Sequence, residues 1–128
     1  MKTAKIFIGI FLIGILSLAV SFVVTRKSIE KSLIEICDSA SEKYDCLPRK
    51  ALLLQLSDSN TSTTQMNETI WAIGKMKINK ALPKLEVMLH SCDNPGYRYN
   101  RCKYELEKTI RYLKNDKIDL MAFKELNK

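Results

Sequence analysis

The stretch "NETIWAIGKMKINKALPKLEVML", Asn67 to Leu89, contains two helical patterns joined by a short connection at residues 77–80. On both sides of the connection, apolar residues recur at intervals of three and four, which places them on one face of a helix. Pro83 stands near the start of the second pattern, where the first helical turn tolerates proline. The first series is Met66, Ile70, Ile73 and Gly74, with Trp71 beside it, and the second is Leu82, Leu85, Met88, Leu89 and Cys92. The stretch predicts a helix, a turn and a second helix.

The same period recurs along the rest of the chain after residue 25, and no segment shows a convincing strand alternation. Further helices are expected at about 27–43, from Pro48 to about 56, and from Cys102 to about 113. Thr64 or Asn67 is expected to cap the helix that follows the polar loop. A short last helix is expected around Ile118, Met121, Ala122, Phe123 and Leu126. The predicted fold class is all-α.

Two pairs of segments in the sequence resemble each other. "LPRKALLL" at 47–54 is echoed by "LPKLEVML" at 82–89, thirty-five residues later, and "ETIWAIGKMK" at 68–77 by "KTIRYLKNDK" at 108–117, forty residues later. The five additional residues lengthen the loop between Cys92 and Cys102. This self-similarity predicts two helical hairpins of about 35–40 residues, with a half unit at each end.

The residues of the quoted stretch also resemble a protein family. Ala72-Ile73-Gly74-Lys75-Met76, followed by Pro83, Leu85, Met88 and Leu89, is similar to a HEAT repeat of the short bacterial type. The resemblance covers about 23 residues closely and 47–126 weakly, and the Arg that the family often has near the start of its second helix has no clear counterpart. It implies a stack of helical hairpins that serves as a binding scaffold. A generic helical bundle is the alternative.

An uncharged segment, "IFIGIFLIGILSLAVSFVV", runs from Ile6 to Val24. As a helix its nineteen residues would be about 28 Å long, enough to cross a bilayer core. A cleaved signal peptide is the alternative, with small residues around Ala19 and Ser21, but the run is long for such a peptide and basic residues follow directly. We expect a signal-anchor or transmembrane segment at 1–25 and an exported α-helical domain at 26–128. Either interpretation brings that domain to a membrane.

The cysteines decide the expected side of the membrane, because basic residues flank the apolar segment at both ends. All four cysteines, Cys37, Cys46, Cys92 and Cys102, follow that segment and form two local pairs. An even number in a small exported domain suggests disulfides, here 37–46 and 92–102, each at the two ends of a helix–helix loop. Four cysteines permit three connectivities. We expect a single-pass inner-membrane protein whose C-terminal domain lies in the periplasm.

The sequence lacks the motifs of the common catalytic sites. It contains no C-x-x-C, G-x-S-x-G or H-E-x-x-H motif and no Gly-rich phosphate loop. His90 lies two positions before Cys92, but no second close ligand pair completes a zinc site. Glu105 and Glu107 point apart on a helix. We expect no catalysis, no cofactor and no metal; export also argues against nucleic acid as the partner of this basic domain.

The loop "NPGYRYNR" is the main candidate for partner binding. Its candidate residues are Tyr97, Arg98, Tyr99 and Arg101. Tyr and Arg are enriched in protein interfaces, and a covalently closed loop loses less entropy on contact. In the alternative, the tyrosines pack back on the domain and the arginines are merely exposed. A second basic patch, with a purely solvated surface as its alternative, comprises Lys75, Lys77, Lys80 and Lys84.

These features predict a membrane-anchored periplasmic protein–protein interaction module without catalysis, whose partner is an envelope or exported protein. The alternative is an inhibitor or immunity protein that neutralises an exported toxin enzyme, since a rigid loop can plug an active-site cleft. A thiol-redox enzyme is a more distant alternative. The sequence does not indicate an oligomeric state.

Overall fold

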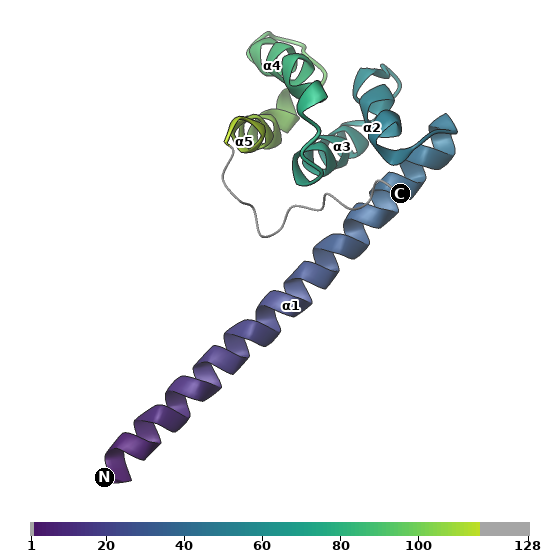
Figure 1. Ribbon diagram of the computed structural model, residues 1–128. Coiled ribbons are helices and arrows are strands. Elements are labelled where there is room, and N and C mark those ends of the chain that lie inside the picture. Colours follow the sequence, from purple (N-terminus) through teal and green to yellow (C-terminus); the bar gives the residue numbers. More distant parts are fainter. Residues whose placement is uncertain (1, 116–128) are drawn as a thin grey trace. The chain divides into compact units, whose positions relative to one another are not determined.

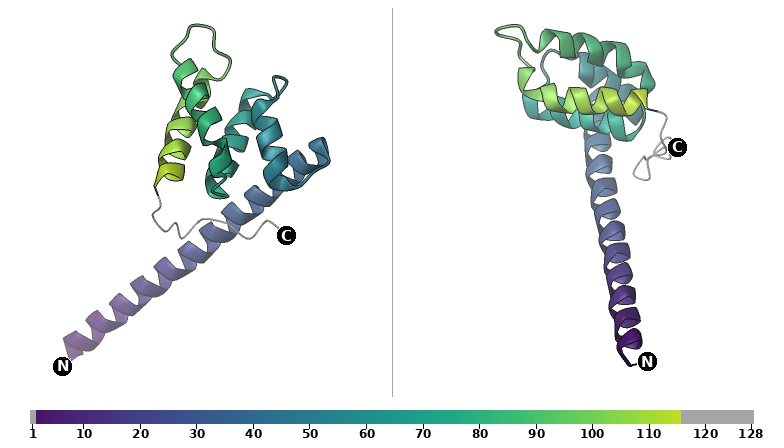
Figure 2. Two further views of the ribbon diagram at one scale, coloured as in Figure 1. Left: turned by 45° about the horizontal axis from the view of Figure 1, so that its top comes forward. Right: turned by 90° about the vertical axis from the view of Figure 1, so that its left-hand side faces the viewer.

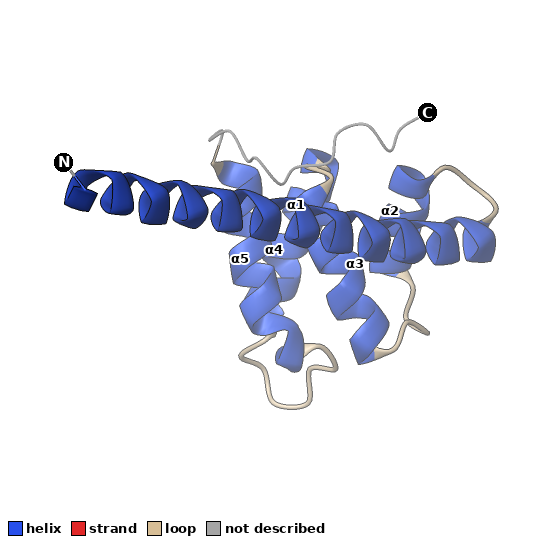
Figure 3. Ribbon diagram, turned by 90° about the horizontal axis from the view of Figure 1, so that it is seen from below, coloured by secondary structure: helices blue, strands red, loops and turns tan. Residues whose placement is uncertain are grey.

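The computed structural model of the chain describes residues 2–115, and every regular element in that range is helical (Figure 1). The predicted all-α class is therefore confirmed for these residues, and Figure 3 shows only helices and loops among them. The helix expected around 118–126 lies outside the described residues. The elements are α1 (Lys2–Tyr44), α2 (Pro48–Ser57), α3 (Thr63–Lys75), η1 (Asn79–Ala81), α4 (Leu82–Ser91), η2 (Asn100–Cys102) and α5 (Lys103–Lys114).

The chain divides into two compact units, Met1–Ser32 and Leu33–Lys128, which we describe separately. The first unit is the N-terminal part of α1. Its large apolar side chains are exposed, among them Phe7, Phe11 and Leu18. The helix is long and apolar enough to cross a membrane, so a single-pass anchor and a signal sequence are both consistent with it.

The second unit is built from two helical hairpins. The first is α2–α3 and the second α4–α5; α3 packs against both α2 and α5, and α4 packs against α5. The internal echoes predict this division, whereas the quoted stretch 67–89 runs from α3 of one hairpin into α4 of the next. The largest fully buried side chains include Leu33, Leu52, Met66, Ile70, Ile73, Met76, Leu85 and Leu106. Four of these belong to α3 or its C-cap, which makes that helix the centre of the core.

A capping box starts α3. The Gln65 amide donates to Ser62 Oγ over 3.3 Å, and the Ser62 amide donates to Gln65 Oε1 over 3.2 Å. These two bonds satisfy donors that a helix N-terminus otherwise leaves unpaired. The expected cap at Thr64 or Asn67 is therefore wrong, since both residues lie inside the helix. Pro48 and Pro83 occupy the first turns of α2 and α4, as predicted for both helices.

Basic side chains hold the C-terminal ends of α3 and α5. Arg49 Nη2 donates to the carbonyl of Met76, the C-cap of α3, over 2.9 Å. Lys77 Nζ donates to the carbonyls of Tyr112 over 2.6 Å and Asn115 over 3.1 Å, at the end of α5. Lys77 itself has a positive φ of 51°. Cations near the last carbonyls of a helix satisfy unpaired acceptors and complement the helix dipole. Arg49 thereby ties α2 to the end of α3 within the first hairpin, and Lys77 ties the connection after α3 to the end of α5.

Asp58 links the end of α1 to the end of α2 within the second unit. Its carboxylate accepts hydrogen bonds from Tyr44 Oη over 2.6 Å, from Lys43 Nζ over 2.8 Å and from the Asn60 amide over 2.8 Å. These donors, Lys43 first, hold the pKa of Asp58 well below its ordinary value. The connection between α2 and α3 is thereby held close to the end of α1.

The two hairpins approach each other closely at Gly74 of α3 and Thr109 of α5. A Cβ atom at Gly74 would lie 3.1 Å from Thr109 Oγ1, tighter than ordinary van der Waals contact. Thr109 is buried, and its hydroxyl donates to the carbonyl of Ile70 over 3.2 Å. A residue without a side chain is therefore needed here for α3 and α5 to pack at this distance.

Candidate interaction surfaces

The loop predicted to bind a partner, Cys92 to Cys102, packs on the connection between α2 and α3. Tyr99 Oη donates to the carbonyl of Thr61 over 2.8 Å, and the Arg98 guanidinium donates to the carbonyl of Ser59. The Tyr97 and Tyr99 rings meet edge to face, with centroids 6.1 Å apart. The tyrosines are half-buried while Arg98 and Arg101 are exposed, so part of the set serves packing. The assignment of these four residues to partner binding stays a prediction.

The cysteine pair 37–46 does not lie at the two ends of a loop. Cys37 is inside α1, which continues to Tyr44, and its sulfur lies 3.5 Å from the Met76 sulfur in the core. Seven residues of helix from Cys37 to Tyr44 correspond to a rise of about 10 Å, whereas bridged cysteines have Cα atoms roughly 4.4–6.8 Å apart. The structure shows no bridge between Cys37 and Cys46, and the position of Cys37 inside α1 does not favour one; the 37–46 disulfide stays a prediction.

Cys92 and Cys102 both lie next to the carbonyl of Tyr99. Cys92 Sγ lies 3.8 Å from the carbonyl oxygen of Tyr99, and the Cys102 amide donates to that same oxygen over 2.9 Å. Both thiols are buried, and all four cysteines are free in the structure. Burial raises the pKa of both thiols, and the neighbouring Cys92 adds to the rise at Cys102. Such thiols stay protonated at neutral pH, which disfavours a role as nucleophile.

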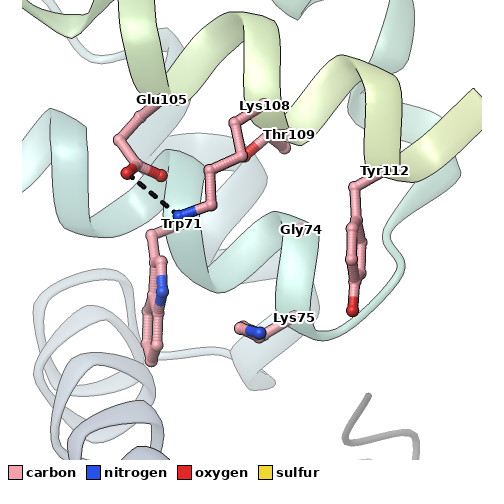
Figure 4. A pocket seen from close by; sticks show the side chains of 7 residues that line it. All are labelled: Trp71, Gly74, Lys75, Glu105, Lys108, Thr109 and Tyr112. Atoms are coloured by element: carbon pink, nitrogen blue, oxygen red, sulfur yellow. Dashed lines mark hydrogen bonds and ion pairs between the residues drawn. The ribbon is translucent and has the colours of Figure 1, made fainter. Parts of the chain in front are cut away.

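A pocket that the sequence did not reveal lies between α3 and α5 (Figure 4). Its lining residues are Trp71, Gly74, Lys75, Glu105, Lys108, Thr109 and Tyr112. The Trp71 and Tyr112 rings stand on opposite sides of Lys75, and the contact of Gly74 with Thr109 lies between the two helices. In the sequence, the only sign of it is Trp71, one position away from the apolar face of its helix. Which residues of α5 face it depends on how the hairpins pack.

The polar groups of this pocket are incompletely paired among the described residues. Lys108 Nζ lies 3.4 Å from Glu105 Oε1, while Glu105 Oε2 and the Tyr112 hydroxyl are buried and have no hydrogen-bond partner in residues 2–115. The ammonium groups of Lys75 and Lys77 lie 5.5 Å and 4.3 Å from the Tyr112 ring centroid. An aromatic pocket that holds ammonium groups, a hydroxyl and a carboxylate suits an apolar side chain next to polar or charged groups.

The predicted basic patch is not one surface. Lys77 is used to cap α5, and Lys75 lies beside Tyr112, whereas Lys80 and Lys84 are exposed. His90 is also exposed. Within residues 2–115 there is no cluster of three or more His, Cys, Asp or Glu side chains that could hold a metal ion.

Comparison of the chain with protein-family models, with curated proteins and with solved structures finds no match. The similarity to HEAT repeats therefore rests on its motif residues alone and stays a proposal. The arrangement of the two hairpins is given by the contacts between their helices.

Proposed function

We propose that the chain is a membrane-anchored protein–protein interaction module without catalysis, whose partner is an envelope or exported protein. One observation carries the proposal: the apolar side chains of residues 6–24 are exposed, directly before a packed helical unit. Exposed apolar surface of this extent is compatible with lipid and not with water. A stack of HEAT-like hairpins would provide the binding scaffold.

We place the helical unit in the periplasm, with the anchor in the inner membrane. The adjacency of Cys92 and Cys102 supports this placement, because oxidation would join them in an exported domain. The bridge would close the Tyr/Arg loop and stabilise it by about 2–3 kcal/mol in the loop-closure model. Cys37 and Cys46 would remain thiols.

The loop between Cys92 and Cys102 is the proposed contact surface. The bond from Tyr99 to Thr61 and the edge-to-face contact with Tyr97 hold it in one conformation, which lowers the entropic cost of binding. Exposed Arg98 and Arg101 then present guanidinium groups to the partner.

Alanine substitution at the loop tests the proposal. Tyr97→Ala or Arg98→Ala is expected to abolish capture of the partner from envelope extracts while helical circular dichroism is unchanged. Lys50→Ala, at an exposed residue of α2, is the matched control and is expected to retain capture. If both loop variants kept every partner that the parent protein captures, the loop would not be the binding surface.

An inhibitor or immunity role is the second candidate. The observation in its favour is the loop before η2, which extends beyond the ends of α4 and α5 in both views of Figure 2. Such a projection can enter an enzyme cleft. Deletion of the gene followed by challenge with competitor cells separates the candidates: lysis supports immunity, and unaffected growth supports the interaction module.

A further inference from the structure

The pocket between α3 and α5 combines apolar walls with a buried hydroxyl and a buried carboxylate oxygen, Glu105 Oε2, that have no hydrogen-bond partner in residues 2–115. Trp71 and Tyr112 provide the walls, and the ammonium groups of Lys75 and Lys108 stand at its edge. The Tyr112 hydroxyl is buried with no hydrogen-bond partner in residues 2–115. Leaving a buried donor unpaired costs about 1–3 kcal/mol, so a ligand that accepts from it would gain affinity. The chemistry fits a segment that combines apolar side chains with charged side chains of both signs.

The described chain ends beside this pocket. Tyr112, which lines it, lies three residues before Asn115, the last described residue. Lys77, two residues after Lys75 of the pocket, holds the carbonyls of both Tyr112 and Asn115. The point from which the chain continues is therefore close to the pocket residues at the C-terminal ends of α3 and α5.

The thirteen residues that follow have the required composition. Their sequence, "DKIDLMAFKELNK", has apolar residues at 118, 120, 121, 122, 123 and 126. Carboxylates stand among them at 116, 119 and 125, and lysines at 117, 124 and 128, so the segment carries side chains of both charges. A tether of only a few residues gives an effective concentration on the order of millimolar, so even weak contacts would be occupied.

We propose that the pocket between α3 and α5 is the docking site for this chain's own C-terminal segment, residues 116–128. Apolar side chains of the segment pack against Trp71 and Tyr112, a carboxylate of the segment neutralises Lys75, and one of its lysines pairs with Glu105. An external protein with the same chemistry would then have to displace the segment. The inference does not depend on the proposed partner or on the side of the membrane.

Trp71 reports directly on occupancy, because it is the single tryptophan of the chain. The full chain in detergent micelles is compared with a variant that ends at Asn115 and with full-length Met121→Asp/Phe123→Asp. Both changes are expected to shift Trp71 emission to the red and to increase its quenching by acrylamide. Val87→Asp is the control: it removes an exposed apolar side chain of α4, outside the pocket lining, and is expected to change neither quantity.

A synthetic peptide of residues 116–128, added to the shortened protein, is expected to restore the parent emission and quenching. The same peptide with aspartate in place of Met121 and Phe123 is expected to have no effect. Should the shortened protein lose helical circular dichroism, the full-length double variant decides the question. Equal quenching of parent and double variant would overturn the proposal. Quenching that falls with rising protein concentration would also overturn it, because the occupant would be a second copy.

Discussion

Gly74→Ala is a sensitive test of the packing between α3 and α5. In a helix with free space, alanine in place of glycine stabilises by roughly 0.5–1 kcal/mol. Here the added Cβ atom would lie 3.1 Å from Thr109 Oγ1 and 3.2 Å from its Cγ2. Thr109 is 3% exposed and hydrogen-bonded to Ile70, so it has little freedom to move. Overpacking of a core costs about 1–3 kcal/mol, and we expect a net loss of roughly 1 kcal/mol.

The same substitution should change sign when Thr109 is alanine. Thr109→Ala alone is expected to cost about 1 kcal/mol through its hydrogen bond to Ile70. It also removes both atoms that meet the new Cβ; the remaining Thr109 Cβ would be 3.6 Å away, an ordinary contact. In that background Gly74→Ala is expected to stabilise by roughly 0.5–1 kcal/mol. The resulting coupling energy, about 1.5–2 kcal/mol, is typical of residues in contact.

The cycle is measured by urea unfolding of the full chain at fixed detergent concentration, followed by circular dichroism at 222 nm. Asn67→Ala, at an exposed position of α3, is the control. It should change the free energy of unfolding by the same amount with threonine or alanine at position 109. Equal effects of Gly74→Ala in the two backgrounds, or stabilisation in the parent, would refute the described approach of α3 and α5.

Two further predictions concern Asp58 and the cysteines. Asp58 has a folded pKa below its ordinary 3.8, so its stabilisation is complete above that pH and is lost as the pH falls through the lower folded value. Asp58→Asn should reduce the loss of unfolding free energy at acidic pH. If the free energy of unfolding of this variant fell with pH as steeply as that of the parent, the bonds to Lys43 and Tyr44 would be contradicted. For cysteines, alkylation of denatured, unreduced protein from cells should label Cys37 and Cys46 but leave Cys92 and Cys102 unlabelled. Labelling of all four cysteines would show that the 92–102 bridge does not form, and the proposal of export would lose this support.

Local patterns in the sequence were sufficient for the hairpins. The apolar period and the prolines at positions 48 and 83 predict α2 and α4, and the two echoes predict which helices form each pair. The cap of α3 could also have been predicted, because Ser62 and Gln65 have the spacing of a capping box. Neighbouring Thr and Asn residues are equally good cap formers, which led to the wrong choice.

The joining of the apolar segment to the following helix and the contacts between hairpins were missed. No glycine or proline interrupts the chain between Ile15 and Asp45, so the apolar segment and the helix expected at about 27–43 form one element. The pocket requires α5 to face α3 at Gly74, a contact between residues thirty-five positions apart. Neither the repeated segments nor the apolar period contains that information, because neither specifies which faces of the two hairpins meet.

The basic residues that hold the ends of α3 and α5 have a consequence for protein engineering. Arg49 acts on a helix of its own hairpin, while Lys77 acts on the last helix of the next one. A protein shortened to α4 and α5 alone would therefore leave the final carbonyls of α5 without their ammonium donor. Such a fragment would need a replacement cation at this helix end to be as stable as it is in the full chain.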